Sequence, residues 1–119
     1  MKENILIDLS KTLAIDIIKL CECVGETRQL QVLLNQLLRS GTSVGANIRE
    51  ANYAASRADF INKLQIALKE CYETEYWLEI LQKSEIFADD VVKVLLHDCG
   101  AIRRMLISSI NTTKTNMDN

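Results

Sequence analysis

The stretch that decides the fold runs from Arg39 to Glu50 and reads Arg-Ser-Gly-Thr-Ser-Val-Gly-Ala-Asn-Ile-Arg-Glu. It lies between two apolar runs with helical spacing, although Gly41 and Gly45 each cost about 1 kcal/mol relative to Ala inside a helix. Glycines that weaken a helix need a tertiary reason, and two of them four residues apart form a smooth track along one face. We therefore expect Gly41 and Gly45 to permit close packing, either inside one subunit or between subunits, and the wide apolar faces of the first and third helices favour the second.

A polar stripe runs along the same stretch. Arg39, Ser43, Asn47 and Glu50 follow one another at helical spacings and therefore share one face of the helix. Together with Glu75 of the following helix, they form either a binding or catalytic cluster or a structural polar network. We favour the network, because buried charges need partners and such a network fixes the register of neighbouring helices.

Apolar residues recur at intervals of three and four residues on both sides of this stretch. The chain has 119 residues, no proline, four glycines and 48% apolar residues, which is typical of one all-helical domain. The periodicity predicts helices over residues 3–24, 28–53, 57–83 and 88–111. Short links between them predict an up-down-up-down antiparallel four-helix bundle over residues 1–111, followed by a flexible polar tail over residues 112–119.

The start of the third helix carries a local signal. Ser56 is followed three residues later by Asp59, which resembles a capping box with Asp in the place of Glu or Gln. This pair predicts that the helix begins immediately after Ser56.

Composition limits the partners and the cellular compartment. The formal net charge of −2 is spread evenly, so no basic block favours nucleic acid or an anionic membrane. The amino-terminal apolar run contains acidic residues, unlike a signal peptide, and no run approaches the roughly 18 apolar residues of a membrane span. We expect a cytoplasmic protein without a membrane partner.

The cysteines and the single histidine offer little for catalysis. Cys21 and Cys23 diverge by about 200° on a helix and do not chelate one ion together. His97 has no Glu three residues before it, and Cys99 lies only two residues away on the same helix, so neither a di-iron site nor a Cys–His pair is expected. We interpret the four cysteines as reduced thiols that pack as small hydrophobes, and we expect no metal, cofactor, small-molecule substrate or enzymatic activity.

Two groups of side chains are candidates for contact with nucleic acid. Phosphate contacts would come from four arginines that oligomerisation would have to gather: Arg49, Arg57, Arg103 and Arg104. Base stacking would come from four aromatic residues: Tyr53, Tyr72, Tyr76 and Trp77. The alternatives are solvated surface charges for the arginines and core or subunit-interface packing for the aromatic rings.

The apolar faces of the first and third helices are wider than one stripe. A four-helix monomer needs about three apolar positions per heptad, and several residues exceed that number. The surplus residues are Ile7, Ile15, Ile18, Tyr76 and Trp77. This surplus predicts homo-oligomerisation.

The sequence resembles the bacterial four-helix bundle proteins linked to 23S rRNA intervening sequences, also known as S23 ribosomal proteins. The first half of their signature is matched by Arg39, Ser40, Ser43, Val44, Asn47, Ile48 and Glu50. The second half is matched by Asp59-Phe60-Ile61, Ile66-Ala67 and Glu75. Where many members have glycines after Glu50 and in the third helix, this chain has Ala51 and Lys69-Glu70, which favour continuous helices.

The resemblance implies an up-down bundle that assembles into a homopentamer. The family is also similar to the accessory variability protein of diversity-generating retroelements, a basic pentamer that engages a reverse transcriptase and nucleic acid. We therefore expect a non-enzymatic, self-associating scaffold or adaptor that is linked to RNA or to an RNA-handling protein. The alternative is a module that binds RNA or DNA directly through arginines gathered around the ring.

Overall fold

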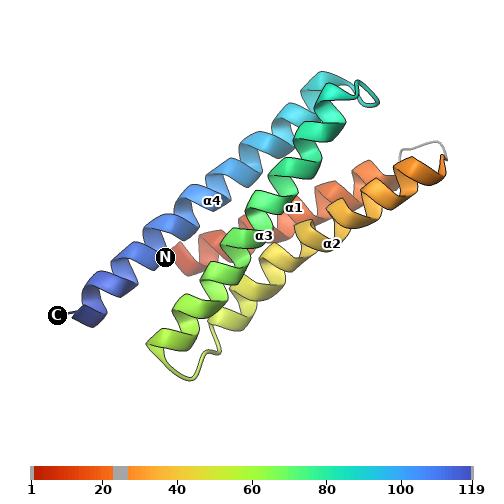
Figure 1. Ribbon diagram of the computed structural model, residues 1–119. Coiled ribbons are helices and arrows are strands. Elements are labelled where there is room, and N and C mark those ends of the chain that lie inside the picture. The colour runs from red at the N-terminus through yellow and green to blue at the C-terminus, as the bar shows by residue number, and fades with distance from the viewer. Residues whose placement is uncertain (1, 23–26, 119) are drawn as a thin grey trace.

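The computed structural model describes residues 2–22 and 27–118 and confirms the all-α fold. The four described helices are α1 (Lys2–Glu22), α2 (Arg28–Ala51), α3 (Arg57–Lys83) and α4 (Asp89–Asp118). Each helix packs against its neighbour in the chain, and α1 also packs against α4. Within the described ranges no Cα atoms of the diagonal pairs α1–α3 and α2–α4 come within 8 Å, so the helices follow one another around a single core (Figure 1).

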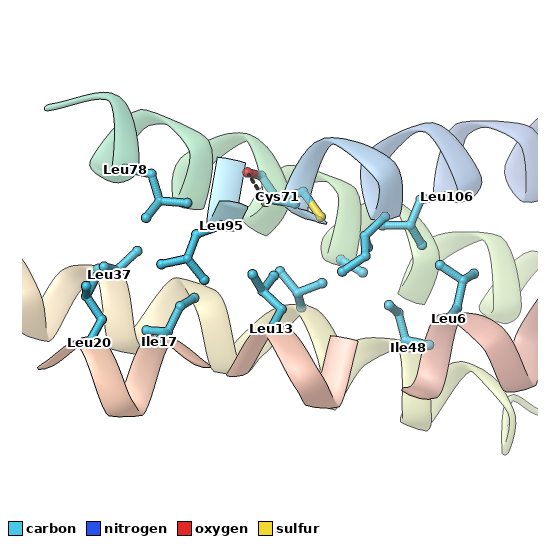
Figure 2. Close-up of a cluster of buried hydrophobic side chains, with 14 of the residues drawn as sticks. Leu6, Leu13, Ile17, Leu20, Leu37, Ile48, Cys71, Leu78, Leu95 and Leu106 are labelled. Atoms are coloured by element: carbon cyan, nitrogen blue, oxygen red, sulfur yellow. Dashed lines mark hydrogen bonds between the residues drawn. The ribbon is translucent and has the colours of Figure 1, made fainter. Parts of the chain in front are cut away.

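The core is built from apolar residues that all four helices contribute at helical spacing. Figure 2 shows Leu13, Leu37, Leu78 and Leu106, one from each helix, pointing into the same interior. These four side chains are fully buried, as are Ile17 and several others. Burial of a side chain of this size stabilises the fold by roughly 1.5–3 kcal/mol, so the core is the main source of stability.

The helix starts are fixed by capping side chains. The Ser56 hydroxyl accepts the amide of Asp59 at 3.1 Å, and the Asp59 carboxylate accepts the amide of Ala55 at 3.2 Å. Ser56 is therefore confirmed as the N-cap of α3, which has the predicted bounds. The reciprocal half of the predicted capping box is wrong, because Asp59 accepts from the amide of Ala55 and not from that of Ser56. Thr27 caps α2 in the same way by accepting the amide of Leu30 at 3.2 Å.

Two of the predicted helix ends are wrong. α2 ends at Ala51, two residues early, because the amides of Asn52, Tyr53 and Ala54 bond to carbonyls only three residues back. α4 does not end near residue 111 but continues to Asp118. The hydroxyls of Thr113 and Thr115 donate to carbonyls four residues earlier, and no proline or glycine interrupts the polar turns, so the segment predicted as a tail is helical as far as residue 118. The predicted end of the first helix and Gly25 lie outside the described residues.

The two glycines of the opening stretch let α1 and α2 approach closely. A Cβ built on Gly41 would overlap Cδ1 of Ile17, and one built on Gly45 would lie 3.1 Å from Oγ of Ser10. Ile17 and Ser10 are themselves buried. Both glycines therefore pack against α1 within the subunit, and the favoured expectation of packing between subunits is wrong for them.

At one end of the molecule, the end of α1 and the start of α2 diverge from the end of α3 and the start of α4 (Figure 1). An open groove of about 490 Å³ lies there between the end of α1 and the start of α4. Its apolar lining is provided by Leu20, Phe87, Val91, Val94 and Leu95. The α1–α4 seam is the least closely packed of the four seams between neighbouring helices.

None of the described helices combines the length and the apolar character needed to cross a membrane.

Candidate functional site

Among the described residues, the side chains of the predicted polar network do not form one connected group. Within the same residues, Asn47 donates to the Ser43 carbonyl of its own helix at 2.9 Å and to no other acceptor. The exposed Glu50 pairs with Lys63 of α3 at 3.2 Å, whereas Arg39 bonds to different residues of α3. Glu75 faces α4 instead of α2. The stripe consists of separate contacts because its residues lie on the outer flank of α2 and not inside the bundle.

Arg39 is held by two carboxylates of α3. Its guanidinium contacts Glu70 at 3.2 Å and also bonds to Glu73. The indole of Trp77 donates to the same Glu73 carboxylate at 3.0 Å, and this bond, followed by that from Arg39, holds the pKa of Glu73 below its usual value. The Arg39 side chain is 48% exposed, so the predicted pairing with a carboxylate is confirmed but the predicted burial is wrong.

Glu75 and Arg103 join α3 to α4. The Nε of Arg103 donates to the Glu75 carboxylate at 2.6 Å, and both side chains are largely buried. This hydrogen bond raises the pKa of the Arg103 guanidinium. The same guanidinium lies 5.8 Å from the ring centre of Tyr72, within the range of a cation–π contact. The carboxylate and the ring therefore fix the position of Arg103.

The buried polar contact between α2 and α3 involves residues that the predicted site did not contain. The hydroxyl oxygens of Ser40 and Thr74 lie 2.9 Å apart, and both residues are fully buried. Thr74 also lies 2.8 Å from the carbonyl of Glu70, and Ser40 lies 3.3 Å from that of Leu37. The sequence contains one sign of this buried contact: Ser40 is a polar residue that lies three positions after Leu37, on the core face of α2.

The four candidate arginines form two separate groups. Arg49 and Arg57 are exposed and flank the turn between α2 and α3. Arg103 lies level with Glu75, which is about 27 Å along α3 from Arg57 at 1.5 Å per residue. The structure therefore places Arg103 and Arg104 together near the middle of the bundle, and it does not join them to Arg49 and Arg57 within one subunit.

Arg103 and Arg104 converge over Gly100, the buried glycine of α4. A Cβ built on Gly100 would lie 3.3 Å from a terminal nitrogen of Arg104 and 3.5 Å from a terminal nitrogen of Arg103. Helical side chains lean toward the amino-terminal turn, so residues three and four positions later cover the same spot. The absent side chain of Gly100 leaves room for both guanidinium groups.

The described thiols are free, and two of the three are buried. Cys71 and Cys99 are fully buried on facing turns of α3 and α4, with the sulfur of Cys99 3.6 Å from the carbonyl of Cys71 (Figure 2). A hydrogen bond with Cys99 and burial raise the pKa of the Cys71 thiol, and burial raises that of Cys21. Across residues 2–22 and 27–118 no group of three potential metal ligands occurs. Cys23 lies outside these ranges.

The outer faces of α1 and α3 carry much of the exposed apolar surface. Ile15 and Ile18 of α1 are 45% and 42% exposed, and Tyr72 and Tyr76 of α3 are 52% and 55% exposed. Trp77 instead packs partly against the core and makes an edge-to-face contact with Tyr76. Ile7 likewise packs against the core, so the predicted surplus is confirmed for Ile15, Ile18 and Tyr76 and wrong for the other two residues.

These features define an antiparallel four-helix bundle whose polar side chains link helices at its surface. The family model of the 23S rRNA-intervening sequence protein matches residues 2–108, and the chain belongs to that family. It is also similar to a crystal structure of a protein of unknown function from the S23 ribosomal protein family of Bacteroides thetaiotaomicron. The two chains are 47% identical, with 93% of this chain and 99% of the other covered and a TM-score of 0.85. The comparison with curated proteins gives no match.

Proposed function

We propose that this chain is a non-enzymatic helical bundle that self-associates and acts as a scaffold or adaptor for RNA or for an RNA-handling protein. The observation that carries the proposal is the apolar surface left exposed on the outer faces of α1 and α3, above all Ile18 and Tyr76. Aromatic and aliphatic side chains that a monomer leaves in water are stabilised by burial against a second copy. Five subunits is the number that the family resemblance implies.

The non-enzymatic part of the proposal is supported by the states of the reactive side chains. A buried thiol with a raised pKa, such as that of Cys71, is a poor nucleophile because the thiolate is the reactive form. The imidazole of His97 is exposed and lies beside the neighbouring Asp98 at 3.3 Å, away from the thiols in the core. A cytoplasmic location is part of the same proposal, and the free thiols of the described cysteines support it.

Light scattering on the purified protein tests self-association directly. The expected mass is five times the 13.5 kDa of one chain, and a pure monomer at micromolar concentration would overturn the proposal. The double variant Ile18→Lys/Tyr76→Lys is expected to lower the mass, because it places charges on the exposed apolar surface. Val32→Lys on the outer face of α2 is the matched control, since Val32 is exposed but belongs to neither face.

Direct binding of RNA or DNA is the second candidate function. The observation that favours it is the convergence of Arg103 and Arg104 over Gly100. Binding through phosphates must weaken steeply with salt, since it releases counterions. Titration of a structured RNA at two salt concentrations tests this candidate, and it fails if no binding is detected at low salt.

A further inference from the structure

We propose that Arg103 and Arg104, converging over Gly100 of α4, bind the phosphate of a nucleotide whose base stacks on the exposed ring of Tyr72. The site lies within one subunit and rests on the second candidate function, direct contact with nucleic acid. It does not depend on the gathering of arginines by oligomerisation.

The spacing of the two guanidinium groups fits one phosphate. Each has a terminal nitrogen within 3.3 or 3.5 Å of the position that a Gly100 Cβ would occupy, so the two nitrogens are separated by no more than the sum of these distances. Charge-assisted hydrogen bonds to phosphate oxygens are about 2.7–2.9 Å long, and one phosphate offers several oxygens. A single phosphate can therefore accept from both side chains.

The electrostatic balance of the site favours an anion. The Nε of Arg103 donates to Glu75, and the terminal nitrogens of that guanidinium have no acceptor among the residues that the structure describes. Among the residues that the structure describes, no carboxylate lies within 4 Å of Arg104. The guanidinium groups of Arg103 and Arg104 together with the Glu75 carboxylate have a net positive charge. A bound phosphate would relieve the repulsion between the two guanidinium groups.

Tyr72 provides a flat surface beside the arginines. Its ring is 52% exposed, and its centre lies 5.8 Å from the Arg103 guanidinium. Base stacking on an aromatic side chain contributes about 1–3 kcal/mol per base and tolerates any sequence. A phosphate with an adjoining planar base satisfies both parts of the site, whereas an isolated phosphate satisfies only the arginines.

The test is fluorescence anisotropy of a labelled oligouridine of about 12 nucleotides, at ionic strengths of about 0.01 M and 0.15 M. The proteins compared are the parent chain, Arg104→Ala, Arg104→Lys and the matched control Arg49→Ala, which removes the same charge from the other arginine group. We expect Arg104→Ala to weaken binding about tenfold and to reduce the salt slope by about 0.7. Arg104→Lys should restore part of the affinity, and Arg49→Ala should change it less than twofold.

The stacking part is tested by Tyr72→Leu and Tyr72→Phe and by competition with uridine monophosphate and inorganic phosphate. We expect Tyr72→Leu to weaken binding several-fold and Tyr72→Phe to leave it unchanged, because a phenyl ring still stacks. Uridine monophosphate should displace the oligomer at lower concentration than inorganic phosphate does. Equal competition by the two would overturn the assignment of a nucleotide.

The remaining outcomes separate the site from the functions. Equal weakening by Arg104→Ala and Arg49→Ala would overturn this site while leaving nucleic-acid binding in place. Absence of oligouridine binding at the lower ionic strength would overturn the site, and direct nucleic-acid binding is overturned with it only if the structured RNA also fails to bind. Light scattering measures self-association separately, and because Tyr72 lies one turn from Tyr76 on α3, the mass of the Tyr72 variants is compared with that of the parent. Circular dichroism confirms that each variant is folded.

Discussion

At the residue scale, the glycines illustrate how one residue type serves two purposes. Gly41 faces buried Ile17 across the α1–α2 contact, whereas Gly100 lies beneath the ends of two long arginine side chains. The Ile17 side chain is fully buried in the core, whereas the side chains of Arg103 and Arg104 extend toward solvent. The same added methyl group therefore meets an immobile obstacle at one site and a movable one at the other.

Gly41→Ala and Gly100→Ala are expected to change stability in opposite directions. Gly41→Ala should lower the free energy of unfolding by about 1–2 kcal/mol, because the overlap with Ile17 outweighs the gain in helix propensity. Gly100→Ala should raise it by about 0.5–1 kcal/mol, because the arginine ends move aside and the unfolded chain loses freedom. Urea denaturation of both variants measures the two changes, and a Gly41→Ala protein as stable as the parent would contradict the first.

The residues that the sequence pattern missed also belong to this scale. Helical periodicity places Ser40 on the core side of α2, but it does not show whether a small hydroxyl finds a partner there. That depends on Thr74 of α3 lying opposite it. The pattern predicts that Glu75 of α3 joins the polar stripe of α2, but a position beside the core stripe of α3 can face either neighbouring helix. The rotation of α3 directs Glu75 toward Arg103 of α4.

At the element scale, the link from α3 to α4 contains the one non-glycine residue with positive φ among those described. Glu85, with φ of 57°, follows the C-cap residue Ser84, and its amide bonds to the carbonyl of Gln82 at 3.3 Å. Glycine usually occupies this position because a Cβ is unfavourable in the left-handed region. The link is therefore strained at one exposed residue.

Glu85→Gly is expected to stabilise the protein by about 0.5–1 kcal/mol, because relief of the left-handed conformation exceeds the added entropy of the unfolded chain. The control is Glu79→Gly in the exposed interior of α3, which should destabilise it by about 1 kcal/mol. Thermal unfolding followed by circular dichroism compares the two, with about 4 °C expected per kcal/mol. A lower melting temperature for Glu85→Gly would show that the strain is absent.

The surface contact between α2 and α3 predicts a dependence of stability on pH. Hydrogen bonds from Trp77 and Arg39 hold the pKa of Glu73 below its usual value. The ionised Glu73 carboxylate therefore stabilises the folded protein above the unfolded-state pKa of about 4.3, and this stabilisation is lost as the pH falls through the folded-state pKa. Glu73→Gln should therefore be less stable than the parent at about pH 7, and the difference should shrink below about pH 4. Urea denaturation at both pH values measures this.

The control for the pH experiment is Glu79→Gln, because the Glu79 carboxylate of the parent forms no ion pair among the described side chains. It should parallel the parent at both pH values. A stability difference between Glu73→Gln and the parent that stays constant with pH would contradict the linkage.

At the scale of the whole molecule, the fold follows from the sequence far more directly than the polar contacts do. A repeat of three and four residues requires only that each helix bury one face, and the absence of proline with short links leaves little choice but an antiparallel bundle. Contacts such as Arg39 with Glu73 depend on helix rotation and on long side chains that reach several positions. The extension of α4 to Asp118 was missed because residues 111–116 bury almost nothing, so no apolar period marks them.

The divergence of the two hairpins has a consequence for the dynamics of the molecule. Because α1 meets α4 across the least closely packed seam, the smallest cooperative opening releases α1 while α2, α3 and α4 remain associated. We expect native-state deuterium uptake to be fastest in α1 near Leu20, at the open end, and slowest in α3 near Cys71, which packs between two neighbours. Uniform protection across all four helices would indicate instead that the bundle opens only as a unit.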